Sequence, residues 1–109
     1  MAINFNGRVA IVTGAGGGLG RQHALALAAR GAKVLVNDLG SGVHGEGGSV
    51  SPAQAVVDEI RAAGGEALAN GASVTDFAAV EAMVQQAIDA WGRVDILVNN
   101  ARRFFRIPS

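Results

Sequence analysis

The sequence predicts an α/β protein built on a doubly wound parallel sheet, and three observations support this fold class. Four short apolar runs alternate with three helical patterns along the 109 residues. The runs lack polar alternation, which is typical of strands that helices cover on both faces. Right-handed crossovers join parallel strands, so the order β-α-β-α-β-α-β indicates one parallel sheet, truncated after its fourth strand.

The expected strands are the four apolar runs themselves. The third run, Ala-Leu-Ala, is the weakest, because alanine has little preference for strands. The runs cover residues 9–12, 34–36, 67–69 and 96–98.

The expected helices have recognisable ends. The first runs from Leu19 to Arg30 and stops at Gly31, a residue suited to a helix C-terminus. Ser51 and Pro52 predict an N-cap followed by proline at the first helical position. The buried face of this second helix should carry Ala53, Val56, Val57 and Ile60, and Gly64-Gly65 should end it.

The third helix has one apolar stripe and ends at Gly92. We expect Phe77 and Trp91, at its two ends, to be anchors in the core. The stripe consists of Phe77, Val80, Val84, Ala87, Ile88 and Trp91.

Composition excludes several classes of function. Half of the residues are hydrophobic and 17% are charged, which indicates a globular chain rather than a disordered one. The chain has no cysteine, so disulfides and thiolate ligands are excluded, and His23 and His44 are too isolated to predict a metal site. No apolar run approaches the ~20 residues that span a bilayer, and no signal peptide is recognisable. We expect a cytoplasmic protein with no membrane or nucleic-acid partner.

A glycine-rich loop follows the first strand directly and opens the first helix. Its sequence is Thr-Gly-Ala-Gly-Gly-Gly-Leu-Gly, residues 13–20. Glycines permit the sharp turn, and bare backbone amides at a helix N-terminus bind a pyrophosphate. The spacing GxGxxG fits in no register, and no Gly-Lys-Ser/Thr follows; Thr-Gly-x-x-x-Gly-x-Gly fits fully. The loop therefore predicts a Rossmann-type dinucleotide site.

Asp38 follows the second apolar run, close to the ~20-residue spacing after the loop at which such sites place an acid. The acid accepts hydrogen bonds from the adenosine ribose hydroxyls, and its charge would repel a 2′-phosphate. Neither Gly17 nor Leu39 offers a positive charge to attract one. NAD(H) is therefore expected rather than NADP(H).

These residues, with Asn-Asn-Ala at 99–101, resemble the short-chain dehydrogenase/reductase family over residues 5–101. Arg102 departs from the family's Asn-Asn-Ala-Gly. Asn37-Asp38-Leu39-Gly40 and the glycine-rich stretch after it are similar to one subgroup. That subgroup contains the hydroxyacyl-CoA dehydrogenase part of peroxisomal multifunctional enzymes and their bacterial relatives. The resemblance implies an NAD-dependent oxidoreductase for an alcohol or ketone, such as a 3-hydroxyacyl-CoA-like substrate, with homo-oligomeric full-length relatives.

The resemblance also implies roles for single residues. Thr13 and Asn99 would be structural, bonding the loop and the end of strand four. Asn100 would lie near the nicotinamide ribose. Serine replaces the family's aspartate beside the adenine. The implied cofactor-binding set is Gly14, Gly18, Leu19 and Gly20 at the pyrophosphate, Asp38 at the adenosine ribose, Ser73 and Val74 at the adenine, and Asn100.

The catalytic residues that the resemblance implies, a serine, a tyrosine and a lysine, cannot be assigned here. The sequence has no tyrosine, and its only lysine, Lys33, starts the second strand. We therefore expect residues 1–101 to form a Rossmann half-domain and residues 102–109, with three arginines and no acid, to be an atypical tail. A frame disruption or truncation of the coding sequence would explain both. An open apolar edge at the fourth strand then predicts a marginal fold and weak NAD binding.

Two alternatives remain open at this point. One is a non-catalytic nucleotide-binding fragment or pseudogene product. The other is a methyltransferase using S-adenosylmethionine, since Gly-x-Gly-x-Gly at 14–18 fits its pattern and Asp38 could bind a ribose there. Such enzymes usually have an acid shortly before the first glycine, whereas this chain has Val12 and Thr13.

Overall fold

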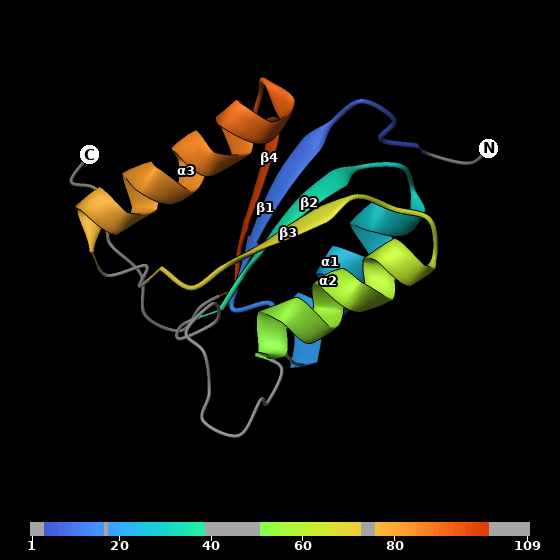
Figure 1. Cartoon of the computed structure of the whole chain (residues 1–109). Helices are drawn as coiled ribbons and strands as arrows, with labels where there is room; N and C mark the ends of the chain where they lie inside the picture. Colours follow the sequence, from blue (N-terminus) through green and yellow to red (C-terminus); the bar gives the residue numbers. More distant parts are fainter. Residues whose placement is uncertain (1–3, 17, 39–50, 73–75, 101–109) are drawn as a thin grey trace.

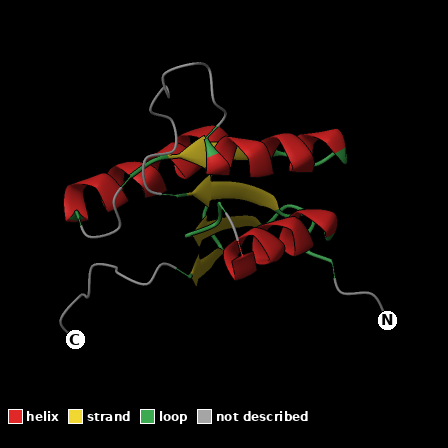
Figure 2. Cartoon of the chain, turned by 90° about the horizontal axis from the view of Figure 1, so that it is seen from below, coloured by secondary structure: helices red, strands yellow, loops and turns green. Residues whose placement is uncertain are grey.

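A computed structural model describes residues 4–16, 18–38, 51–72 and 76–100. It confirms the α/β doubly wound parallel sheet, with helices on both faces (Figures 1 and 2). Each expected strand and helix is present. In chain order they are β1 Val9–Thr13, α1 Gly18–Ala29, β2 Lys33–Asn37, α2 Pro52–Ala62, β3 Ala67–Asn70, α3 Phe77–Trp91 and β4 Ile96–Asn99.

The order of the strands in the sheet is β3-β2-β1-β4, and every pairing is parallel. The chain runs outward from β1 through β2 to β3, then crosses back to place β4 on the other side of β1. The order therefore reverses between β1 and β4. In open α/β sheets, ligands bind outside the carboxyl ends of the strands at this kind of reversal. The fold itself thus points to the end of β1, where the glycine loop begins.

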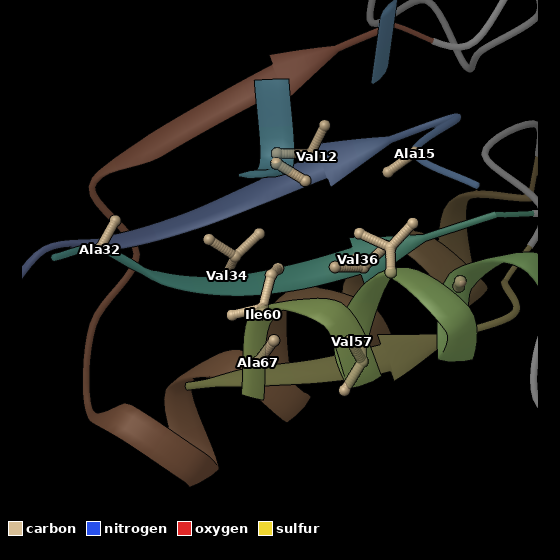
Figure 3. Close-up of a cluster of buried hydrophobic side chains, with 11 residues drawn as sticks. Val12, Ala15, Ala32, Val34, Val36, Val57, Ile60 and Ala67 are labelled. Carbon is tan, nitrogen blue, oxygen red and sulfur yellow. The ribbon is translucent and has the colours of Figure 1, made fainter. Parts of the chain in front are cut away.

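Strand alternation divides the core into two clusters. Val12, Val34 and Val36 face α1 and α2, and Figure 3 shows this cluster against the sheet. Ile11 and Leu35 face α3 on the opposite side. Every residue of β1 is buried, and so are four of the five in β2, which explains why both runs are apolar without alternation.

The ends of α2 agree with the sequence prediction. Ser51 is the N-cap, and its side chain accepts a hydrogen bond from the Gln54 amide at 3.2 Å. Pro52 is the first helical residue, where its missing N–H costs nothing. The four residues predicted for the buried face are all at most 2% exposed, namely Ala53, Val56, Val57 and Ile60.

The prediction that Phe77 is a core anchor is wrong, because this residue is 48% exposed. At 100° per residue, Phe77 and Ile88 lie roughly 60–80° to one side of Val80. The face that packs against the sheet is centred on Val80 and includes Met83, which the predicted stripe omitted and which is 1% exposed. Trp91 does pack against this cluster, as expected.

The edge strand β4 is only partly covered. Val98 packs against the cluster beneath α1, but Leu97 points away from it and is 63% exposed. This agrees with the open apolar edge expected from the sequence. Within the described ranges, no helix combines the length and the apolar character that crossing a membrane requires.

Candidate dinucleotide-binding site

The glycine loop joins β1 to α1 at the carboxyl edge of the sheet. Gly14 and Gly18 have φ values of 61° and 57°, in the left-handed region that favours glycine. Gly20 is buried in the first turn of α1. A Cβ on Gly20 would collide with the Gly14 carbonyl group and lie 2.8 Å from Nδ2 of Asn100. These glycines therefore let the backbone turn and let α1 pack closely on the loop.

The first turn of α1 offers its free backbone N–H groups at this edge. A helix N-terminus carries a partial positive charge, and no acidic side chain occupies this turn to neutralise it. Leu19, in the same turn, is 59% exposed. The bare backbone and the N-terminal amides fit a pyrophosphate. The four residues expected around it thus lie together in one turn of chain.

Asp38 lies beside the same loop, at the end of β2. Its Oδ2 accepts a hydrogen bond from the Gly16 amide at 2.6 Å, and the residue is half-buried. A Cβ on Gly16 would collide with this carboxylate and with Cβ of Pro52, the first residue of α2. The fold thus brings the predicted ribose ligand onto the glycine loop. Our sequence reasoning did not single out Gly16 or Pro52 for this contact.

Thr13 and the two asparagines at the carboxyl end of β4, Asn99 within the strand and Asn100 just after it, close the other side of the loop. The Thr13 hydroxyl accepts a hydrogen bond from the Asn100 amide at 3.0 Å and donates one to Oδ1 of Asn99 at 3.0 Å. These hydrogen bonds support the structural roles that we expected for Thr13 and Asn99. Asn100 follows the end of β4, with Nδ2 near Gly20. Ser73 and Val74, expected at the adenine, lie outside the described residues.

A concavity elsewhere among the described residues is a separate feature. It has a volume of 630 Å³ and lies at the amino-terminal end of the sheet, opposite the glycine loop. The residues around it come from the ends of α1 and α2, the start of β2 and the segments that precede β1 and β3, and they include Asn6, Arg30, Lys33, Glu59 and Glu66. None of the predicted cofactor residues belongs to it.

An ion-pair cluster also lies at that amino-terminal end. Asp95 accepts hydrogen bonds from the Arg93 guanidinium and, at 2.9 Å, from the Val9 amide. The hydrogen bond from Arg93 is the main reason why the pKa of Asp95 is lowered, and the Val9 amide adds to it. This contact fixes the connection before β4 to the start of β1, and so helps to set the β1–β4 register.

Comparison with known proteins agrees with this geometry. The family model described as short chain dehydrogenase matches residues 8–103. The chain belongs to this family. The match is to dehydrogenases, so the methyltransferase alternative is not supported.

Similar curated proteins come from the subgroup that the sequence suggested. The chain is 61% identical over 99 residues to peroxisomal multifunctional enzyme type 2 of Drosophila melanogaster and 57% identical over 101 residues to peroxisomal multifunctional enzyme A of Dictyostelium discoideum. These matches cover 91% and 93% of this chain but only 16% and 22% of the relatives. The chain therefore spans a small part of the length of these multifunctional enzymes.

Solved structures show the same relationship. A short chain dehydrogenase from Mycobacterium avium superposes with a TM-score of 0.80 at 58% identity, covering 88% of this chain and 34% of that one. A hydroxysteroid dehydrogenase from Escherichia coli gives a TM-score of 0.79 at 40% identity, covering 90% and 38%. The fold of the described residues is thus that of the matching third of these dehydrogenases.

Proposed function

We propose that this chain is the cofactor-binding part of an NAD-dependent oxidoreductase that acts on a secondary alcohol or ketone. The observation that carries the proposal is the 2.6 Å hydrogen bond between the Gly16 amide and the Asp38 carboxylate. It fixes a negative charge at the rim of a loop whose bare amides suit a pyrophosphate.

Each residue of the site then has a separate task in binding. The amides of the loop and of the α1 N-terminus bind the pyrophosphate, around Gly14, Gly18, Leu19 and Gly20. Asp38 uses one oxygen for Gly16, and within the described part of the chain no donor contacts the other, which can accept from the ribose hydroxyls. Asn100 orients the nicotinamide ribose.

The carboxylate also favours NAD over NADP. A 2′-phosphate would place a second negative charge beside Asp38. At a separation of ~4 Å, like charges repel by about 1–4 kcal/mol between bulk water and a protein surface. No arginine or lysine among residues 13–20 offsets that repulsion.

The nicotinamide supplies hydride transfer when it is bound, and the chain's residues bind and orient it. The similarity to proteins named as peroxisomal multifunctional enzymes supports an acyl-CoA-like alcohol or ketone as the substrate. On this proposal residues 1–101 form the binding unit and 102–109 a tail with no part in it. Homo-oligomers and a cytoplasmic location remain predictions, and several relatives are named as peroxisomal.

A second reading is a nucleotide-binding chain without catalysis of its own. The absence of tyrosine from the sequence favours it, because the family's general acid/base would be missing. Incubating the purified chain with NAD and a secondary alcohol tests whether this chain catalyses the reaction by itself. NADH formation at 340 nm would reject the second reading.

Calorimetric titration of the chain with NAD and NADP tests the proposed cofactor. We expect NAD to bind more tightly, and Asp38→Asn to weaken NAD by about tenfold or more, as for loss of hydrogen bonds to a charged group. Asp89→Asn, an exposed carboxylate on α3 bonded to Gln85, is the matched control and should change neither affinity. NADP binding as tight as NAD in the parent chain would overturn the proposal.

A further inference from the structure

Each strand of the sheet ends in a polar residue at the edge where the site lies. The last residues are Thr13, Asn37, Asn70 and Asn99. They form two cross-strand pairs in register, Thr13 with Asn99 and Asn37 with Asn70. The first pair belongs to the family motif described above. The second pair, between β2 and β3, has no role in the proposed function so far.

The second pair is part of a hydrogen-bonded amide chain. Nδ2 of Asn37, a residue only 1% exposed, donates to Oδ1 of Asn70 at 2.9 Å and to the Ala72 carbonyl at 3.1 Å. Nδ2 of Asn70 donates to Oε1 of Gln86 on α3 at 2.8 Å. Nε2 of Gln86 donates back to the Ala69 carbonyl at 3.3 Å. This series of hydrogen-bonded amides thus connects α3 through β3 to the end of β2.

The same residues contact the cofactor site through their backbone. The Asn37 carbonyl accepts a hydrogen bond from the Ala15 amide of the glycine loop at 2.9 Å. The Asp38 amide donates to the Asn70 carbonyl at 3.1 Å. Asp38 is therefore fixed on one side by Gly16, through its side chain, and on the other by Asn70, through its backbone.

We propose that Asn70 and Gln86 are positioning residues for Asp38, and that α3 thereby helps to set the preference for NAD over NADP. The proposal rests on the role given to Asp38 above. A buried amide such as Asn37 must keep its partners, because an unsatisfied buried donor is costly. Removing Gln86 leaves Nδ2 of Asn70 without this acceptor, so the side chain is held only through Oδ1, by Asn37 and by the Ala72 amide at 2.8 Å. We expect the Asn37–Asn70 bond at the end of β2 to weaken as a result.

Substitutions at two neighbouring glutamines of α3 give a matched test. Gln86→Leu removes both amide contacts, whereas Gln85→Leu removes only an exposed contact with Asp89. Asn70→Ala is the more severe variant. Gln86→Glu keeps the acceptor for Asn70 and should rescue part of the effect.

Two measurements on the full chain separate positioning from mere stability. Amide hydrogen exchange by NMR should show about threefold to tenfold faster exchange at Asp38 and Gly16 in Gln86→Leu, as for one lost hydrogen bond, and none of this in Gln85→Leu. The ratio of the dissociation constants for NADP and NAD should fall by a similar factor, with Gln86→Glu intermediate.

The outcomes also distinguish this proposal from the assignment of Asp38. Unchanged exchange at Asp38 and Gly16 in Gln86→Leu would overturn the positioning role, whatever the cofactor. A lower melting temperature with an unchanged NADP-to-NAD ratio would overturn it as well, because the residues would then be structural only. If exchange is faster in Gln86→Leu but the parent protein does not prefer NAD, the hydrogen-bonded network from Gln86 to Asn37 is supported. Its link to cofactor specificity and the proposed function are then both rejected.

Discussion

Gly16→Ala is the substitution that tests the site most directly. Gly16 does not have a positive φ, so its backbone conformation accepts an alanine. The obstacle is space, because the added Cβ would collide with Oδ2 of Asp38 and Cβ of Pro52, and would lie 2.9 Å from Cγ of Asp38. Pro52 is fixed as the first residue of α2, so the Asp38 side chain is the group that must move.

The expected loss follows from the contact that this movement breaks. A hydrogen bond to a charged group contributes about 1.5–3 kcal/mol. Moving the carboxylate breaks the bond from the Gly16 amide and displaces the acceptor for the ribose hydroxyls. We therefore expect NAD affinity to fall about 10- to 100-fold, and NADP affinity to fall much less, since Asp38 disfavours NADP in the parent chain.

Gly65→Ala is the control for this experiment. Its Cβ would also be crowded, 2.8 Å from Cγ2 of Ile60, but at the opposite end of the sheet. Both variants should lose some stability in urea unfolding, whereas only Gly16→Ala should change the titration with NAD. NAD affinity and NADP-to-NAD selectivity that match the parent in Gly16→Ala would refute the assignment of Asp38 to the ribose.

Three further predictions concern stability and association. Asp95→Asn removes the ion pair with Arg93, which lowers the pKa of Asp95. The parent should therefore be more stable than this variant above about pH 4, and the difference should vanish as the pH falls through the lowered pKa of Asp95. Urea unfolding midpoints of both proteins from pH 7 to 2 would show this. An advantage that persisted at pH 2 would contradict this. Ser51→Ala removes the N-cap of α2 and should cost about 1 kcal/mol in urea unfolding, with a loss near zero counting against the cap. Leu97 is exposed on the edge strand β4, so Leu97→Lys should reduce self-association measured by light scattering without lowering the melting temperature. Unchanged self-association would show that the β4 edge is not where the molecules associate.

Much of the fold could be predicted because its strands and helices have strong local signals. The buried strands β1 and β2 are apolar throughout, and Ser51-Pro52 and Gly92 mark helix ends by capping rules that depend on few residues. The buried side of α3 was harder. Its apolar residues cover more than one face, so periodicity alone could not separate the side that meets the sheet from the flank that carries Phe77.

The site divides in a similar way. The spacing in the glycine loop identified Gly14, Gly18 and Gly20, because positive φ and close backbone approach leave a mark in the sequence. No pattern in the sequence indicated the contact between Gly16 and Asp38. It depends on the β1–β2 register and on where α2 begins, and both are set by tertiary packing.

The only lysine in the sequence, Lys33, lies at the opposite edge of the sheet from the proposed cofactor site. Lys33 starts β2 and Asn37 ends it, so at about 3.3 Å per residue the two Cα atoms are about 13 Å apart along the strand. Asp38 and the glycine loop lie at the carboxyl edge, whereas Lys33 borders the cavity at the amino edge. Its ammonium group therefore cannot assist a proton transfer beside the nicotinamide. The proposed dinucleotide site does not use this ammonium group, so we expect NAD binding by the chain to be independent of Lys33.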